Sequence, residues 1–144
     1  EEITDNEINA EYQNNIFGEM TVRHILISPD TTDDMTEEEK ETKEEEAKKK
    51  AEDLIKQLDQ GADFATLAKE NSDDEGSKED GGLVSDFTKD SVVESFWNAS
   101  MNLKDGEYTK EPVESDYGYH IILRVSQKEK PKLEDVKDDI LNNS

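Results

Sequence analysis

Three things are scarce in this 144-residue sequence: cysteine, basic residues and long apolar runs. There is no cysteine, which excludes a disulfide-stapled scaffold and a zinc site built on thiolates. The 17 Lys and Arg residues are outnumbered by 39 Asp and Glu residues, so the net charge is −22. That balance leaves no basic surface of the kind a nucleic-acid binder needs. No run of about 18 apolar residues occurs that could span a membrane as a helix. The length suits a single domain, with or without disordered flanks.

Hydrophobic residues make up only 31% of the chain, and so low a share in a strongly charged chain is typical of disorder. A mostly disordered acidic spacer is therefore one hypothesis. The apolar residues are clustered, however. Residues 21–28 (TVRHILIS) and 117–126 (YGYHIILRVS) are both rich in branched and aromatic side chains, which predicts two central strands. The agreement between these strands and the helical pattern that lies between them favours a folded domain.

The segment after the first strand carries a helix signal. Thr36 and Glu39 match a capping box, and apolar residues then recur at helical spacing until Gly61, at Ala47, Ala51, Leu54, Ile55 and Leu58. We expect one long amphipathic helix. A short helix with Phe64, Leu67 and Ala68 on one side follows, then a polar loop over 71–82, a short strand over 83–87, and a third helix containing Val92, Val93, Phe96 and Trp97. This order predicts an α+β domain on a small, mainly antiparallel sheet.

The two ends of the chain differ from the middle. Residues 1–15 and 131–144 each predict a charged, weakly amphipathic helix that would be marginal alone, with apolar positions at Ile3, Ile8 and Tyr12 and at Leu133, Val136, Ile140 and Leu141. We expect flanking segments at 1–20 and 128–144 around a domain at 21–127, the flanks having packed on something else. Because the sequence begins with Glu1-Glu2 rather than Met, we expect a mature fragment or an excised piece.

The chain has only two histidines, His24 and His120, and each falls inside one of the two strongest predicted strands. A histidine in an apolar strand is commonly a satisfied core residue, and a catalytic role is the alternative. Two histidines without a third ligand do not make a metal site. An EF-hand loop starting at Asp30 would place Met35 where glycine is required, so we expect no calcium loop.

Several segments together resemble a parvulin-type peptidyl-prolyl isomerase domain: VRHILIS at 22–28, GADFATLAKENSDD at 61–74, GG at 81–82 and EPVESDYGYHIILRV at 111–125. Their order and spacing agree over about residues 21–126. The flanks are similar to the segments that bracket the parvulin domain in PrsA-type extracellular foldases of Gram-positive bacteria. The resemblance implies a parvulin-like (FKBP-like) fold, a small antiparallel four-stranded sheet flanked by about four helices.

The resemblance also implies roles for individual residues. His24 and His120 match the paired histidines at the floor of the family's active site, while Asp74 and Ser115 match the polar partners in the same hydrogen-bond network. The family's substrate-binding positions correspond to Leu26, Val84, Val92, Phe96 and Tyr117. It implies no cofactor and no metal.

Two stretches depart from the family pattern. The common GGDLG turn is Gly81-Gly82-Leu83-Val84-Ser85 here, and Asp86 follows it. Val92 replaces a longer side chain. These changes affect the expected depth of the proline pocket, so the alternative to an enzyme is a binding module of the same fold with little or no isomerase activity.

The implied function is noncovalent cis/trans isomerisation of X–Pro bonds in unfolded or partly folded exported proteins. Residues 28–39 hold no Lys or Arg, so we expect no preference for phosphopeptides. The resemblance places the parent protein at the extracellular face of the membrane or in the cell wall of a Gram-positive bacterium, secreted or lipid-anchored. We expect the isolated domain to be monomeric.

Overall fold

The centre of the molecule is a four-stranded antiparallel sheet, seen in a computed structural model that describes residues 4–142. The strand order is β2-β1-β4-β3, with β1 at Met20–Ile27, β2 at Leu83–Phe87, β3 at Val113–Ser115 and β4 at Gly118–Gln127. The predicted strands at 21–28, 83–87 and 117–126 are confirmed within one residue at each end. The two central strands are the ones that carry the two histidines.

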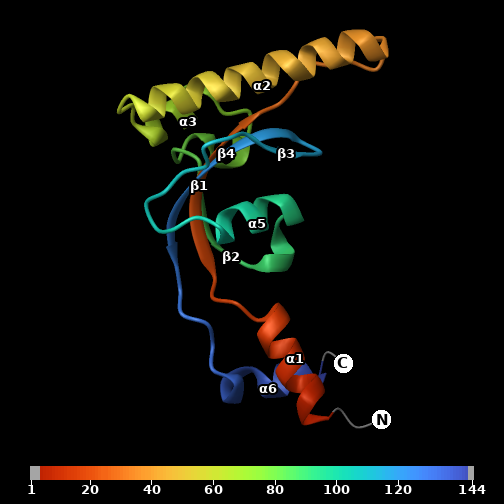
Figure 1. Cartoon of the computed structure of the whole chain (residues 1–144), viewed down its shortest axis with the longest axis vertical. Helices are drawn as coiled ribbons and strands as arrows, with labels where there is room; N and C mark the ends of the chain where they lie inside the picture. Colours follow the sequence, from red (N-terminus) through yellow and green to blue (C-terminus); the bar gives the residue numbers. More distant parts are fainter. Residues whose placement is uncertain (1–3, 143–144) are drawn as a thin grey trace.

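Helices cover both faces of this sheet (Figure 1). On one face, α2 (Glu37–Asp59) and α3 (Phe64–Asn71) bury Ile25, Ile27 and Ile121 of the central strands. On the other face, α5 (Glu94–Met101) packs on Met20, Val22 and Ile122. Successive strand residues point to opposite faces, so His24 and His120 share the even-numbered face with Val22 and Ile122, on the side of α5.

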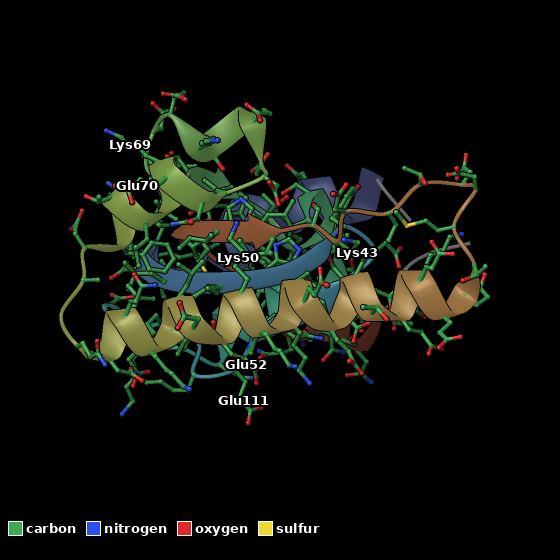
Figure 2. The ribbon with its side chains drawn as sticks, turned by 90° about the horizontal axis from the view of Figure 1, so that it is seen from above. Lys43, Lys50, Glu52, Lys69, Glu70 and Glu111 are labelled. Carbon is green, nitrogen blue, oxygen red and sulfur yellow. The ribbon has the colours of Figure 1, made fainter. Side chains whose placement is uncertain are left out.

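The long helix α2 begins where the capping box predicts. The Thr36 hydroxyl accepts a hydrogen bond from the Glu39 backbone N–H and donates one to the Glu39 carboxylate. The apolar stripe is buried as expected, at Ala47, Ala51, Leu54, Ile55 and Leu58. The buried residues of α2 begin at Ala47, near the middle of the helix, and the N-terminal turns extend past the sheet (Figure 1). Seen from above, Glu52 on α2 and Lys69 and Glu70 on α3 point away from the sheet (Figure 2).

Two details of the predicted elements are wrong. Residues 71–82 are not all loop, because α4 (Glu75–Lys78) forms one helical turn with Asp74 as its N-cap. A single turn buries too little apolar surface to leave a periodic pattern in the sequence. The third helix starts only at Glu94, and Val92 and Val93 precede it in extended conformation. Counting α4, four helices lie around the sheet, and the predicted α+β class is confirmed.

The flanking helices α1 (Asp5–Asn15) and α6 (Leu133–Asn142) lie against each other, away from the sheet (Figure 1). Ile8 and Ile140 are buried, and the Tyr12 hydroxyl donates to the Pro131 carbonyl at 2.7 Å. Ile3 and the side chain of Leu141 lie outside the described residues. Within the described part of the chain, no helix is both long and apolar enough to cross a membrane.

Candidate active site

A cavity of about 430 Å³ opens on the α5 side of the central strands. It is bounded by β1, β4, the end of α5 and the residues around the short 3-10 turn η1 (Lys89–Ser91). All five predicted substrate-binding residues line it: Leu26, Val84, Val92, Phe96 and Tyr117. Of the predicted catalytic residues, His24, Asp74 and His120 also line it, and Ser115 contacts His120 from the adjoining strand β3. The structure therefore gathers all nine predicted residues at one place.

The two histidines form the floor. Leu26 on β1 is paired with His120 on β4, and His24 is paired with Ile122, so the two imidazoles lie diagonally on one face of the sheet. Their rings stack with centroids 5.5 Å apart and planes inclined by 22°. The Nδ1 atoms are 3.3 Å apart. Phe96 presents a nearly perpendicular contact to each ring, at centroid distances of 5.3 Å and 5.4 Å, so an apolar side chain covers both histidines.

A chain of hydrogen bonds runs through these rings. His24 Nε2 lies 2.7 Å from the Asp74 carboxylate, and His120 Nε2 lies 2.6 Å from the Ser115 hydroxyl. A carboxylate only accepts, so His24 carries its proton on Nε2 and leaves Nδ1 as an acceptor. His120 must then donate from Nδ1 and accept from Ser115 at Nε2. Every hydrogen bond in the chain therefore points toward Asp74.

The electrostatics of the site favour two neutral histidines beside an ionised Asp74. Burial lowers the pKa of His24, against the opposing pull of the Asp74 carboxylate. Burial, reinforced by the neighbouring His24, lowers the pKa of His120 to about 4. Burial works against ionisation of Asp74 as well, but hydrogen bonds from Ser77 and His24 outweigh it and lower the pKa of Asp74.

Local chain geometry holds Asp74 at the end of β1. The strand β2 pairs with β1 only as far as Arg23. Beyond that point the Ser72 hydroxyl accepts from the Leu26 N–H at 3.1 Å and the Asp73 N–H donates to the Leu26 carbonyl at 2.7 Å. Asp74 then caps α4, with one carboxylate oxygen accepting from the Gly76 N–H and the other from His24. Asp74 is thus both the N-cap of α4 and the hydrogen-bond partner of His24.

Four residues of the site were missed in the sequence. Asp90, Ser91 and Val93 line the cavity, and the Ser77 hydroxyl donates to the Asp74 carboxylate at 2.6 Å. Ser77 lies on α4, within the segment predicted as loop. The Asp-x-x-Ser spacing of 74–77, an N-cap followed by a hydroxyl residue three positions on, was the signal that could have found it. Across residues 4–142, no group of three or more His, Asp or Glu side chains is placed to hold a metal ion.

The sequence matches a family model that agrees with this geometry. The model, described as the PPIC-type PPIase domain, covers residues 8–129. The chain belongs to the PPIC-type peptidyl-prolyl isomerase family, the parvulins. The predicted resemblance is confirmed.

Relatives of this parvulin domain include a longer foldase. Foldase protein PrsA 3 of Bacillus cereus is 36% identical over 138 residues, which are 96% of this chain and 41% of the relative. A crystal structure of the peptidylprolyl isomerase PrsA from Bacillus cereus superposes with a TM-score of 0.73 at 33% identity, covering 98% of this chain and 46% of that one. The chain thus spans less than half the length of these relatives.

A shorter relative matches about three quarters of this chain. The solution structure of NmPin, the parvulin of Nitrosopumilus maritimus, has a TM-score of 0.57 at 32% identity. It covers 76% of this chain, while 97% of that protein is matched. A parvulin that is matched over nearly its whole length therefore has no counterpart for about a quarter of this chain.

Proposed function

We propose that this chain isomerises X–Pro bonds without forming a covalent intermediate, with His24, Asp74, His120 and Ser115 as the catalytic group. The observation that carries the proposal is the position of an apolar cavity directly on the neutral histidine chain. The walls from Val84, Val92 and Phe96 suit a proline ring. The floor presents polar groups that are already hydrogen-bonded to one another.

The reaction needs selective binding of a twisted amide. Amide resonance opposes rotation with a barrier of about 18–20 kcal/mol, and a twisted amide has less charge separation than a planar one. A dry, apolar wall therefore favours the twisted state. Each tenfold gain in rate requires about 1.4 kcal/mol of stabilisation of that state over the planar substrate. Asp74 is held by hydrogen bonds from His24 and Ser77 and is a poor nucleophile toward an amide, which supports the noncovalent route.

The acidic side chains around the cavity support a substrate without a phosphate group. None of the described side chains that line the cavity is Lys or Arg, and two are the carboxylates of Asp74 and Asp90. A second hollow adjoins the cavity at Val93 and is lined by Glu94, Glu114 and Asp116. A phosphorylated side chain before proline would meet repulsion here. We propose unfolded or partly folded proline-containing polypeptides as substrates, without phosphopeptide preference.

For the parent protein we propose a foldase on the extracellular side of a Gram-positive cell. The names and organisms of the relatives support this. We propose further that the flanking segments, predicted at 1–20 and 128–144, belong to a second structural unit beside a monomeric parvulin domain predicted at 21–127. In the structure, β1 begins one residue earlier, at Met20. Support comes from the flanking helices, which pack on each other rather than on the sheet.

A proline-peptide isomerisation assay with Asp74→Asn tests the enzymatic proposal. The substitution keeps the shape of the side chain and removes the charge that accepts from His24. Loss of a hydrogen bond to a charged group is worth about 1.5–3 kcal/mol, so kcat/KM should fall about ten- to a hundredfold. Asp73→Asn is the matched control, because Asp73 bonds the exposed Ser28 N–H rather than a histidine, and it should retain activity.

The same assay, combined with NMR titration of a proline peptide, distinguishes an isomerase from a binding module. A wild-type chain without any rate above background, in which proline peptides still perturb NMR signals of Val92 and Phe96, would identify a binding module instead. Peptides with Ala, Lys, Glu or phosphoserine before proline test the substrate class. Faster turnover of the phosphoserine peptide would contradict the charge argument.

A further inference from the structure

Ser77 occupies the third corner of a hydrogen-bonded triangle at the end of the histidine chain. Its hydroxyl oxygen lies 2.6 Å from Asp74 Oδ2 and 3.2 Å from His24 Nε2. The same Asp74 oxygen lies 2.7 Å from His24 Nε2. Ser77 is only 5% exposed, and α4 carries it against β2 under the turn at Gly81 and Gly82. The contact is thus short, buried and built by the fold.

The directions of these hydrogen bonds are set by the chemistry of the groups. Ionised Asp74 has no proton to give, so the Ser77 hydroxyl donates to it. Oδ2 therefore accepts from both Ser77 and His24, while Oδ1 accepts from the Gly76 N–H at 3.3 Å. Because hydrogen bonds to the charged form favour ionisation, Ser77 makes protonation of Asp74 more difficult.

Protonation of Asp74 would reverse the whole chain. A protonated carboxyl donates, so His24 would accept at Nε2 and carry its proton on Nδ1. His120 would then accept at Nδ1 and donate from Nε2 to Ser115. The two arrangements have the same heavy-atom positions but opposite dipoles along the floor of the cavity. What selects one of them is the charge state of Asp74.

We propose that Ser77 is a positioning residue that stabilises ionised Asp74 and thereby extends to lower pH the range in which the hydrogen-bond chain from Ser115 through both histidines keeps its direction. Ser77 does not line the cavity, so it acts through Asp74 and His24 rather than on the substrate. The catalytic consequence rests on the proposed isomerase function. The effect on proton positions does not.

The groups that titrate near this chain are few. Asp74 contacts His24, which lies on β1. His120, which lies on β4, is the next group beyond His24. Asp90, at η1, lines the same cavity. On the outer side, the Arg23 guanidinium is bonded to the Asp80 and Gly81 carbonyls. Asp74, His24 and His120 are linked by hydrogen bonds, so they titrate on the acid side as one coupled group.

The experiment compares Ser77→Ala with Ser100→Ala in the full chain. Ser100 is also a buried serine, but its hydroxyl donates to the Phe96 backbone carbonyl at 2.8 Å rather than to a carboxylate. Imidazole ¹⁵N and carboxyl ¹³C NMR signals report the tautomers of His24 and His120 and the ionisation of Asp74 as the pH falls. Isomerase activity is followed over the same pH range.

In Ser77→Ala, the Asp74 transition should move up by about one pH unit, the change expected for loss of one hydrogen bond to a charged group. The acid limb of kcat/KM should move with it, and Ser100→Ala should shift neither. Ser77→Thr, which keeps the hydroxyl, should restore the wild-type midpoint. Should Ser77→Ala fail to fold, Ser77→Cys, whose thiol is a weak donor, should show the same upward shift.

An unchanged Asp74 midpoint in the Ser77 variant, or an equal shift in Ser100→Ala, would overturn the proposal. Wild-type protein that shows no isomerase activity would remove the proposed function instead. The NMR titration would still decide the role of Ser77 in that case, so the two failures are distinguishable.

Discussion

His24 and His120 face each other through their Nδ1 atoms, 3.3 Å apart across the two central strands. Only one proton fits between two nitrogens in this geometry, so the pair cannot be doubly protonated without separating. Both rings are buried, at 5% and 4% exposure. The fold therefore requires at least one neutral histidine and favours two.

This pairing predicts that the protein loses stability on mild acidification. Burial, followed by the proximity of His24, lowers the pKa of His120 from 6.5 to about 4, so the unfolded chain binds a proton that the folded chain excludes. The stabilisation is fully present above about pH 6.5 and is lost as the pH falls toward 4. A shift of this size corresponds to about 3 kcal/mol. Urea unfolding at several pH values, followed by fluorescence of the buried Trp97, measures it.

The control for this effect is His120→Gln, which does not titrate. The slope of unfolding free energy against pH between 6.5 and 4 should be smaller in the variant. The net charge of −22 contributes self-repulsion to both proteins, and the comparison cancels it. Equal slopes in the two proteins would contradict the prediction.

Gly82 is predicted to be irreplaceable, because it lies against the backbone of His24. Its φ is +80°, and a Cβ there would come within 2.2 Å of the His24 carbonyl oxygen. Gly82→Ala should cost roughly 2–5 kcal/mol of stability, the sum of left-handed strain and overpacking. Gly61→Ala is the matched control, since Gly61 has φ +98° and a Cβ at this position would meet nothing within 4 Å. It should cost only about 1–2 kcal/mol.

Val92 offers a gain-of-function prediction. It lines the cavity at a position where the parvulin resemblance implies a longer side chain. Val92→Met should extend the apolar contact with the proline ring. One additional buried methylene group contributes about 0.8 kcal/mol. If the transition state gains this energy, kcat/KM should rise roughly two- to fourfold. The exposed Val125 on β4 gives the control Val125→Met. A fall in kcat/KM only in Val92→Met would mean that the cavity is already filled.

The contacts of Lys89 predict that the flanking helix α1 influences the cavity. Its ammonium donates to Asn14 and Asn15 at the end of α1, while its neighbour Asp90 lines the cavity. Lys89→Ala should loosen this wall and raise KM for a proline peptide by up to about fivefold, within the energy of an exposed polar contact. The exposed Lys69 on α3 (Figure 2) gives the control Lys69→Ala. An unchanged KM would show that α1 does not influence the cavity.

The sequence was informative wherever a local signal was strong. The bounds of β1 and β4 follow from dense apolar runs, and the start of α2 follows from Thr36 and Glu39, because strands and caps depend on neighbouring residues. It was uninformative at α4, since one helical turn has no period to detect. Ser77 was missed for that reason, although it donates to the same carboxylate as His24.

By itself, the sequence determined that the chain has an acidic, thiol-free α+β domain with its two histidines on the central strands, because composition and alternation are local properties. Only the tertiary structure decided that His24 and His120 meet at Nδ1, that both proton positions follow from Asp74, and that Ser77 joins them. Those contacts link residues up to 96 positions apart. Their distances depend on strand register and on how a one-turn helix packs beside β2, which no local pattern in the chain specifies.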